Sequence, residues 1–262
     1  MSMSTEEVIA AGQKYVMNTY GRLPIVIDKG EGCYVWDLVG NRYLDLVAGI
    51  AVNSLGHSHP AVTKAIQEQC GKLLHCSNLY WIENQVKLAK LLVEKSGLGK
   101  AFFCNSGAEA NEAAIKLARK WGNGEKYHII TMQKSFHGRT LGSLAATAQE
   151  KYQKAFRPLP EGFSAVPLGD LEALEKEIRP ETCAIMLEPI QGESGIHVPS
   201  KEYMQGVQAL CRKHNILLIL DEVQTGLGRT GKSFAFQNFD LEPDIISLAK
   251  AIANGVPMGA IV

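Results

Sequence analysis

From residue 101 onward, short apolar runs alternate with stretches in which apolar positions recur at helical spacing. Strands are predicted at 101–104, 128–132, 165–168, 184–187, 216–220 and 245–249. Helices are predicted at 108–121, 139–148, 170–178 and 200–214. Because continuous apolar strands that alternate with helices are typical of parallel sheets covered on both faces, we expect an α/β fold with three layers and a mainly parallel central sheet. Ligands bind such sheets beyond the carboxyl ends of the strands, so functional residues are expected there.

The first hundred residues have a more mixed pattern. Ser4 or Thr5 can cap a helix whose first turn contains Glu6 and Glu7. Short strand-like segments are predicted at 25–28, 33–37 and 43–46, separated by glycine turns. Amphipathic helices are predicted at 60–74 and 83–96. The N-terminal part is therefore expected to mix α and β structure.

Composition and charge exclude several classes of protein. The chain has 262 residues, 46% of them hydrophobic and 21% charged, which excludes disordered and collagen-like chains. The 27 basic and 27 acidic side chains give a net charge of zero, so neither a nucleic acid nor a membrane partner is predicted. The N-terminus lacks the features of a secretory signal, and no apolar stretch approaches the ~20 residues that span a bilayer. We therefore expect a cytoplasmic protein.

The predicted strand at 101–104 is followed by Asn105 and then by a capped helix start. Ser106, Gly107 and Ala108 combine a hydroxyl group with backbone N–H groups that have no acceptor within the helix. Such a helix N-terminus is a ready site for a phosphate group. An ordinary capped helix would have the same local sequence, so this segment alone leaves both interpretations open.

Two further strand ends are followed by aromatic and charged side chains. The candidates after the strands at 128–132 and 184–187 are Phe136, His137, Arg139, Glu188 and Glu193. The ring of Phe136 could cover a flat ligand, and Arg139 could bind a carboxylate through two parallel hydrogen bonds. Glu188 and Glu193 flank a glycine turn. Taken singly, each of these side chains is more common in a core or on a solvated surface.

Asp221 and Lys250 each come directly after a predicted buried strand. Five aliphatic residues precede Asp221, so its carboxylate must be paired or become protonated. The protonated ring nitrogen of a pyridine cofactor would suit it, and so would a structural Arg or Lys. Burial of Lys250 would lower its pKa and supply the neutral amine that Schiff-base chemistry requires. Lys250 lies 29 residues after Asp221, which allows one crossover, so the two side chains could meet in one crevice.

Two other motifs are weaker. Gly226-Leu227-Gly228-Arg229-Thr230-Gly231 fits the dinucleotide-binding pattern, but it starts five residues after Asp221 and opens no clear helix. His57 and His59 are separated by one residue, without an obvious third ligand nearby. No metal site is therefore predicted, and a dinucleotide-dependent oxidoreductase is only a distant alternative.

Taken together, these segments resemble the class III, fold type I aminotransferases, which depend on pyridoxal 5′-phosphate (PLP). The matching segments are 105–111, 135–140, 188–189, 221–226 and 247–250. Five segments in the same order are far more specific than any one of them. The resemblance implies the large PLP-binding domain of this fold for residues 61–262. It implies an N-terminal segment and part of an α+β small domain for residues 1–60.

The resemblance also implies roles in binding the cofactor. The turn at 106–108 would hold the phosphate, while Phe136 and Val223 would cover opposite faces of the pyridine ring. Asp221 would pair with the ring nitrogen, and Lys250 would bind the cofactor covalently as a Schiff base. The other residues assigned to the cofactor in this way are His137, Glu188 and Gln224. Asp221 and Lys250 are the expected catalytic residues.

For the substrate, the resemblance implies that Arg139 binds the α-carboxylate and that Tyr20 also contributes. Glu193 would lie near the mouth of the site and help it accept both a long amino donor and glutamate. Within the class, the segments at 18–22, 52–57 and 77–80 resemble the acetylornithine-specific members. The implied reaction moves the terminal amino group of N-acetylornithine to 2-oxoglutarate, in arginine biosynthesis.

Members of this family continue beyond the position of Val262, so we expect the sequence to be part of a longer chain. The family's active sites usually form between two subunits, which implies a homodimer. Another donor of the same class stays open: ornithine, 4-aminobutyrate or succinyl-diaminopimelate. A cofactor-binding homologue without catalytic activity is a further alternative.

Overall fold

The computed structural model describes residues 3–262, in two compact units that divide between Ser77 and Asn78. The sequence placed a domain boundary after residue 60, whereas α3 (Pro60–Cys70) belongs to the first unit. The predicted division into a small-domain segment and a PLP-binding domain stays a prediction, because the two units are defined by compactness alone.

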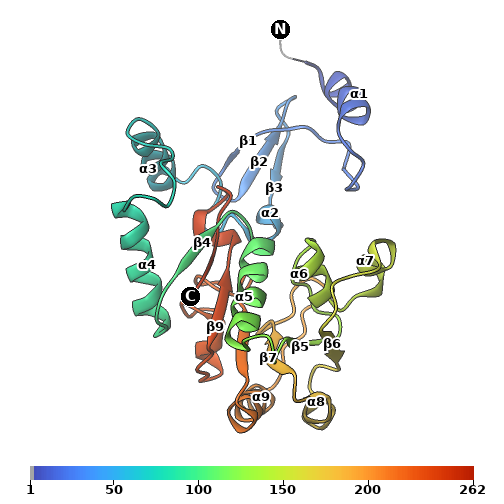
Figure 1. The fold of residues 1–262 in the computed structure, drawn as a ribbon. Helices are drawn as coiled ribbons and strands as arrows, with labels where there is room; N and C mark the ends of the chain where they lie inside the picture. The colour runs from blue at the N-terminus through green and yellow to red at the C-terminus, as the bar shows by residue number, and fades with distance from the viewer. Residues whose placement is uncertain (1–2) are drawn as a thin grey trace. The chain divides into compact units, whose positions relative to one another are not determined.

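The first unit, described from residue 3 to 77, combines helices with a small antiparallel sheet. Its elements are α1 (Thr5–Tyr15), β1 (Ile27–Glu31), β2 (Tyr34–Asp37), β3 (Arg42–Leu44), α2 (Ala48–Ala51) and α3. Of the two predicted caps, Ser4 and Thr5, Ser4 caps α1, and Glu7 completes a capping box. The strands follow one another in the order β1-β2-β3 (Figure 1). Among residues 3–77, none is fully buried.

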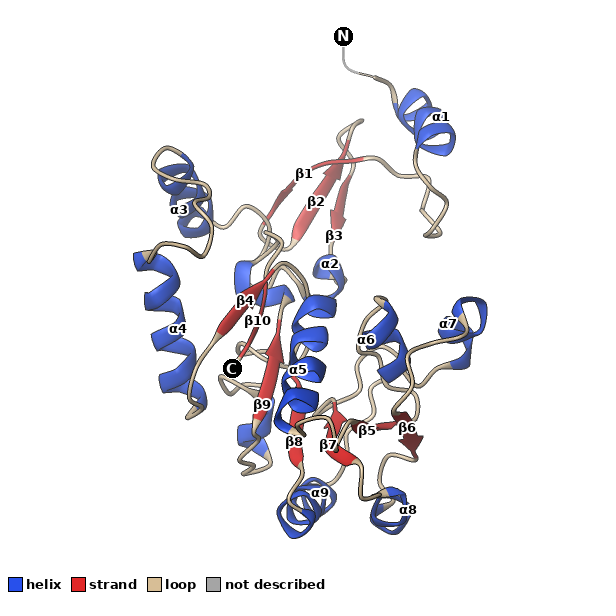
Figure 2. Cartoon of the chain, viewed as in Figure 1, coloured by secondary structure: helices blue, strands red, loops and turns tan. Residues whose placement is uncertain are grey.

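The second unit, residues 78–262, is built on one sheet of seven strands. The strands are β4 (Phe102–Cys104), β5 (His128–Met132), β6 (Phe163–Val166), β7 (Thr182–Leu187), β8 (Leu217–Asp221), β9 (Ile245–Leu248) and β10 (Gly259–Ile261). Their order is β4-β10-β9-β8-β7-β5-β6, and the pairs from β9 to β6 are parallel. β10 is antiparallel to both of its neighbours, β4 and β9. The predicted mainly parallel sheet is thus confirmed (Figure 2).

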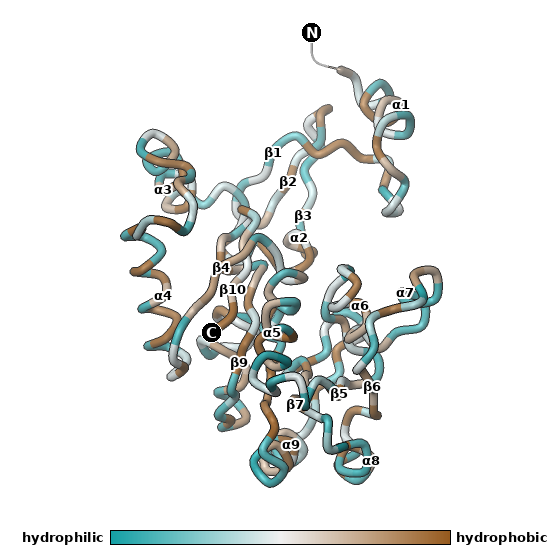
Figure 3. Tube along the Cα trace, in the orientation of Figure 1, coloured by the Kyte–Doolittle hydropathy of each residue, from teal (hydrophilic) through white to brown (hydrophobic). Residues whose placement is uncertain are grey.

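Helices cover both faces of this sheet. They are α4 (Glu83–Ser96), α5 (Gly107–Trp121), α6 (Leu141–Ala146), α7 (Glu150–Gln153), α8 (Leu171–Glu177) and α9 (Lys201–His214), with short 3₁₀ turns η1 (Lys154–Phe156), η2 (Ala235–Asn238) and η3 (Lys250–Ala253). One apolar cluster joins α5 and α6 to one face, and a second joins α4, α8 and α9 to the other. Figure 3 shows hydrophilic residues along α8, which has a solvent-facing side. The three-layer arrangement follows from these two cores.

Two predicted elements differ from the observed ones for identifiable reasons. β6 lies two residues before its predicted position because Pro167, which has no N–H group, cannot continue the ladder beyond Val166. The helix predicted at 139–148 is shortened to α6. It ends at Ala146, and the hydroxyl group of the following Thr147 donates hydrogen bonds to the carbonyl groups of Ser143 and Gly138.

Candidate functional site

The carboxyl ends of the central strands bring distant segments together. Asp221 on β8 lies opposite Ser247 on β9. Ser247 precedes Lys250 by three residues. Gly107 lies so close to the loop after β8 that a Cβ atom placed on it would be 2.9 Å from Cγ1 of Val223. The same atom would be 3.4 Å from Cβ of Ala249. The start of α5, the end of β8 and the end of β9 therefore meet at one edge of the sheet.

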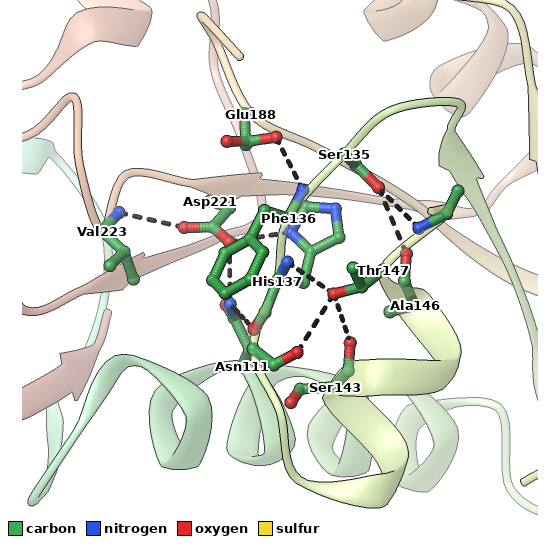
Figure 4. Close-up of polar contacts among 12 residues, drawn as sticks. Asn111, Ser135, Phe136, His137, Ser143, Ala146, Thr147, Glu188, Asp221 and Val223 are labelled. Atoms are coloured by element: carbon green, nitrogen blue, oxygen red, sulfur yellow. Dashed lines mark hydrogen bonds and ion pairs between the residues drawn. The ribbon is translucent and has the colours of Figure 1, made fainter. Parts of the chain in front are cut away.

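Asp221 is buried at this edge and accepts hydrogen bonds from three directions (Figure 4). Its Oδ2 accepts a hydrogen bond from Nδ2 of Asn111 and another from Nδ1 of His137, each at 2.7 Å. Its Oδ1 accepts from the backbone N–H of Val223 at 3.0 Å. Among the described residues, the ion-pair partner of Asp221 is this histidine, and neither an Arg nor a Lys forms an ion pair with it. The structural Arg or Lys that the sequence left open as a partner is thus not observed among these residues.

His137 and Glu188 form an electrostatic pair next to Asp221. Burial disfavours the charged imidazole, but the hydrogen bond and the negative charge of Asp221 outweigh burial and raise the pKa of His137. Burial raises the pKa of Glu188 to about 7, and the charge of Asp221 adds to this rise. The Glu188 carboxyl group accepts a hydrogen bond from the backbone N–H of Phe136 at 3.1 Å (Figure 4). Three titratable side chains thus share one buried region.

Lys250 begins η3 with a left-handed backbone conformation, at a φ of 51°. This region is uncommon for residues other than glycine and is found preferentially at functional sites. Burial lowers the pKa of the Lys250 amine, against the opposing charges of Asp221 and Glu188. The direction is the one expected for an amine that must lose its proton before it attacks a carbonyl group. The influence of both acids on Lys250 also places it in the same electrostatic neighbourhood.

The segment predicted to bind phosphate forms the start of α5. Ser106 is the N-cap, and its hydroxyl group accepts a hydrogen bond from the N–H of Glu109 at 3.2 Å. The first N–H groups of the helix point out of its end, as in any α-helix. Because this end lies against Val223 and Ala249, an anion bound there would be close to the ends of β8 and β9.

A second group of predicted residues is linked through Tyr152, which the sequence did not single out. The ring of Phe136 meets the ring of Tyr152 edge to face, with centroids 5.7 Å apart. The guanidinium carbon of Arg139 lies 5.0 Å from the centre of the same ring. Glu193 accepts a hydrogen bond from the Tyr152 hydroxyl group and another from Gln149 at 2.7 Å. Tyr152 thus connects an aromatic, a cationic and an anionic candidate.

Asn111 is the other residue that sequence analysis missed. It lies on α5 and is buried with Ala110 and Ala114, although its side chain is polar. A buried amide on an alanine-rich helix face is a recognisable signal, because such a group needs hydrogen-bond partners. Tyr152 carries no comparable signal, since an aromatic residue in a short charged segment is ordinary.

The comparison with protein families decides the identity of this arrangement. The sequence matches the family described as aminotransferase class-III over residues 15–262. This chain belongs to that family. The resemblance drawn from the five sequence segments is therefore confirmed. The three-layer fold that it implied is confirmed as well.

Named relatives of this class III aminotransferase chain agree with the resemblance. It is 57% identical to the acetylornithine aminotransferase of Caldanaerobacter subterraneus subsp. tengcongensis and 55% identical to that of Methanocaldococcus jannaschii. The alignments cover 97% and 99% of this chain and 66% of each relative. The chain thus spans less than two thirds of the length of these relatives. A solved structure of an ornithine aminotransferase from Toxoplasma gondii, which contains PLP at partial occupancy in its active site, is also similar, with a TM-score of 0.94. The match covers 99% of this chain and 63% of the Toxoplasma chain, at 35% sequence identity.

The glycine motif at 226–231, the question of a metal site and the role of Tyr20 remain to be compared with the structure. Gly231 opens no α-helix, and the loop from Gly226 instead folds back so that the N–H of Phe236 binds the carboxylate of Glu222. Within residues 3–262, no group of three or more His, Cys, Asp or Glu side chains could hold a metal ion. No helix in the described part of the chain is long and apolar enough to cross a membrane. Tyr20 lies in the first unit, so its predicted role in binding substrate is untested.

Proposed function

We propose that this chain carries the cofactor-binding core of an acetylornithine aminotransferase that uses PLP. The observation that supports this most directly is the meeting of Asp221, Lys250 and the N-terminus of α5 at one edge of the sheet. Each of the three would contact a different part of one cofactor. The high identity to acetylornithine aminotransferases supports the same substrate class.

The donor set of Asp221 fits a protonated ring nitrogen. A carboxylate has about four lone-pair positions, two on each oxygen. Asn111 and His137 use both positions of Oδ2, and the N–H of Val223 uses one position of Oδ1. One acceptor position of Oδ1 is left for a further donor. A pyridinium N–H is such a donor, and its positive charge would compensate a carboxylate in a buried place.

The proposed division of labour among the side chains follows from their chemistry. When bound, the cofactor supplies a carbonyl group that captures amines and a protonated ring that withdraws electrons. Asp221 would hold the proton at the ring nitrogen, with Phe136 and Val223 against the ring faces and Gln224 near its oxygen. Nζ of Lys250, whose lowered pKa favours the neutral amine, would take up and return the substrate proton. Arg139 would orient the α-carboxylate of the substrate.

The proposed donor is N-acetylornithine, and the proposed acceptor is 2-oxoglutarate. Glu193 is held by Tyr152 and Gln149, which would keep its negative charge near the entrance for one of the two substrates. The proposed complete enzyme is a homodimer. In support, Leu79, Tyr80 and Trp81 are 83%, 67% and 93% exposed, and adjacent large apolar side chains are typical of interfaces.

The experiment that tests the cofactor assignment is chemical trapping. The chain is incubated with PLP and reduced with sodium borohydride, and its peptides are analysed by mass spectrometry. We expect the reduced cofactor on Lys250 alone, because that lysine combines burial with two neighbouring acids. Lys250→Ala should abolish the label, whereas Lys232→Ala, in an exposed loop, should retain it. A label spread over surface lysines, or retained in Lys250→Ala, would contradict the assignment.

The donor is tested by the conversion of bound cofactor to its aminated form. Single additions of N-acetylornithine, ornithine, 4-aminobutyrate and succinyl-diaminopimelate are followed by absorbance. The fastest conversion is expected with N-acetylornithine. Faster conversion with ornithine would replace the proposed donor and keep the class, while trapping without any conversion would favour the non-catalytic homologue.

A further inference from the structure

Asn111 occupies a position where its amide group serves two partners at once. Its side chain is 1% exposed, and its Nδ2 donates to the backbone carbonyl of His137 at 2.6 Å and to Oδ2 of Asp221 at 2.7 Å. Both hydrogens of the amide are therefore used. A single side chain on α5 thus reaches the end of β8 and the turn that follows β5 (Figure 4).

Asn111 lies near the N-terminal end of α5, so its contacts link this end of the helix to Asp221. Asn111 is one helical turn after Gly107, at the end of α5 proposed to bind phosphate. Asp221 is proposed to bind the ring nitrogen, at the other end of the same cofactor. The ring and the phosphate are joined by a short CH2–O arm, so the spacing between the phosphate and the ring nitrogen can vary only within a narrow range. The protein must therefore keep Asp221 within a narrow range of distance from the start of α5, and Asn111 is a direct hydrogen-bonded link between the two.

We infer that Asn111 is a positioning residue, which couples the phosphate end of the site to its ring-nitrogen end by fixing the carboxylate of Asp221. The inference rests on the proposed function, because it needs a ligand that spans both ends. By donating to Oδ2, the amide restricts the rotation of the carboxylate. His137 holds the same oxygen, so rotation of the carboxylate would break two hydrogen bonds.

The test is a thermodynamic cycle between Asn111 and the ring nitrogen. Dissociation constants are measured for PLP and for its deaza analogue, in which a C–H group replaces the ring nitrogen. In Asn111→Ala, we expect binding of PLP to weaken by roughly 10-fold or more, the scale of a lost hydrogen bond to a charged group. Binding of the analogue should weaken by less than about 3-fold, because its C–H makes no hydrogen bond to Asp221.

A control on the same helix separates positioning from general damage. The neighbouring Glu112 accepts hydrogen bonds from the Thr140 hydroxyl group and from the N–H of Ser143, and does not reach Asp221. Glu112→Ala should change the two dissociation constants by the same factor. If Asn111→Ala does not fold, Asn111→Leu keeps a similar side-chain volume and removes both amide donors. It should show the same selective loss.

The outcomes are distinguishable. If the unaltered chain binds neither PLP nor the analogue, the proposed function fails and the role of Asn111 with it. If the unaltered chain prefers PLP but both Asn111 variants weaken the two ligands equally, the proposed function stands and the positioning role is wrong. Selective weakening of PLP alone supports the inference.

Discussion

Asp221 shows how a buried charge is made tolerable by several modest contacts. Asn111, His137 and the N–H of Val223 surround its two oxygens, and the raised pKa of His137 favours the charged imidazole in this pairing. Hydrogen bonds to a charged group stabilise it by about 1.5–3 kcal/mol each, so three can offset much of the cost of desolvation. The acceptor position that remains on Oδ1 follows from the way these three donors are arranged.

Glu188 gives a pH-dependent stability that can be measured. Its pKa is about 7 in the folded chain against an ordinary value of 4.5, so the folded state holds a proton that the unfolded state has lost between these values. The resulting stabilisation is complete below about pH 4.5 and is lost as pH rises through 7. The expected loss is about 3 kcal/mol. Urea unfolding of the cofactor-free chain at pH 5 and pH 8 measures it.

Glu188→Gln is the matched variant, since it keeps the shape and cannot ionise. Its unfolding free energy should fall less between pH 5 and pH 8 than that of the unaltered chain, by about 2–3 kcal/mol. His137 contributes a loss of the same sign in both proteins, because its pKa is also raised. Equal pH dependence in the two proteins would show that Glu188 is ionised at pH 5.

At the residue scale, the sequence predicted the candidates that follow strands and missed those that act across the fold. Asp221 and Lys250 were identified because each ends an apolar run. Asn111 lies 110 positions from Asp221, and no local pattern connects them. Tyr152 was missed for the same reason, since its contacts with Phe136 and Arg139 depend on where a short helix packs.

At the scale of elements, α5 has the central place in the second unit. It packs against β9 and β10 through small residues, including Ala114 and Ala118, which let the helix approach the sheet closely. Its first residue, Gly107, touches the loop after β8. One helix therefore sets the relation between the proposed phosphate site and two strand ends.

The close approach at Gly107 predicts an effect of overpacking. In Gly107→Ala, the new methyl group would lie 2.9 Å from Val223, so one of the two must move. We expect a loss of about 1–3 kcal/mol in unfolding free energy. Val223→Ala should relieve most of this loss when the two substitutions are combined, which urea unfolding of the single and double variants would measure. Additive effects would show that the strain lies elsewhere.

The elements themselves were predicted well where apolar runs are long. The central strands and α5, α8 and α9 fall within a few residues of their predicted positions, because periodicity decides them. The place of β10 in the sheet could not be predicted from the sequence. Its three residues show no periodicity, and its antiparallel pairing with β4 and β9 is a property of the assembled sheet.

At the scale of the whole molecule, the two compact units differ in how much they bury. Both apolar cores consist of residues from the second unit. Residues 3–77 contain no fully buried side chain, and many of their large apolar side chains are exposed, including Met17, Leu23 and Leu46. A unit without a core has little to offset the entropy of an ordered chain.

This difference predicts the behaviour of separated units. A chain of residues 78–262 should unfold cooperatively in urea, because it keeps both cores. A chain of residues 1–77 should show no cooperative transition and a narrow spread of amide resonances by NMR. A cooperative transition in the shorter chain would contradict this expectation. Failure of the longer chain to fold would show that its cores need the first unit.

The position of β10 between β4 and β9 also bears on synthesis of the chain. β4 leaves the ribosome about 150 residues before β10, which is its pairing partner in the sheet. At roughly 5–20 residues per second, the nascent β4 would wait on the order of ten seconds for that partner. During this interval its N–H and C=O groups form an open edge, to which another nascent chain or a chaperone could attach. A strand made much later than β4 is therefore the one that covers this edge.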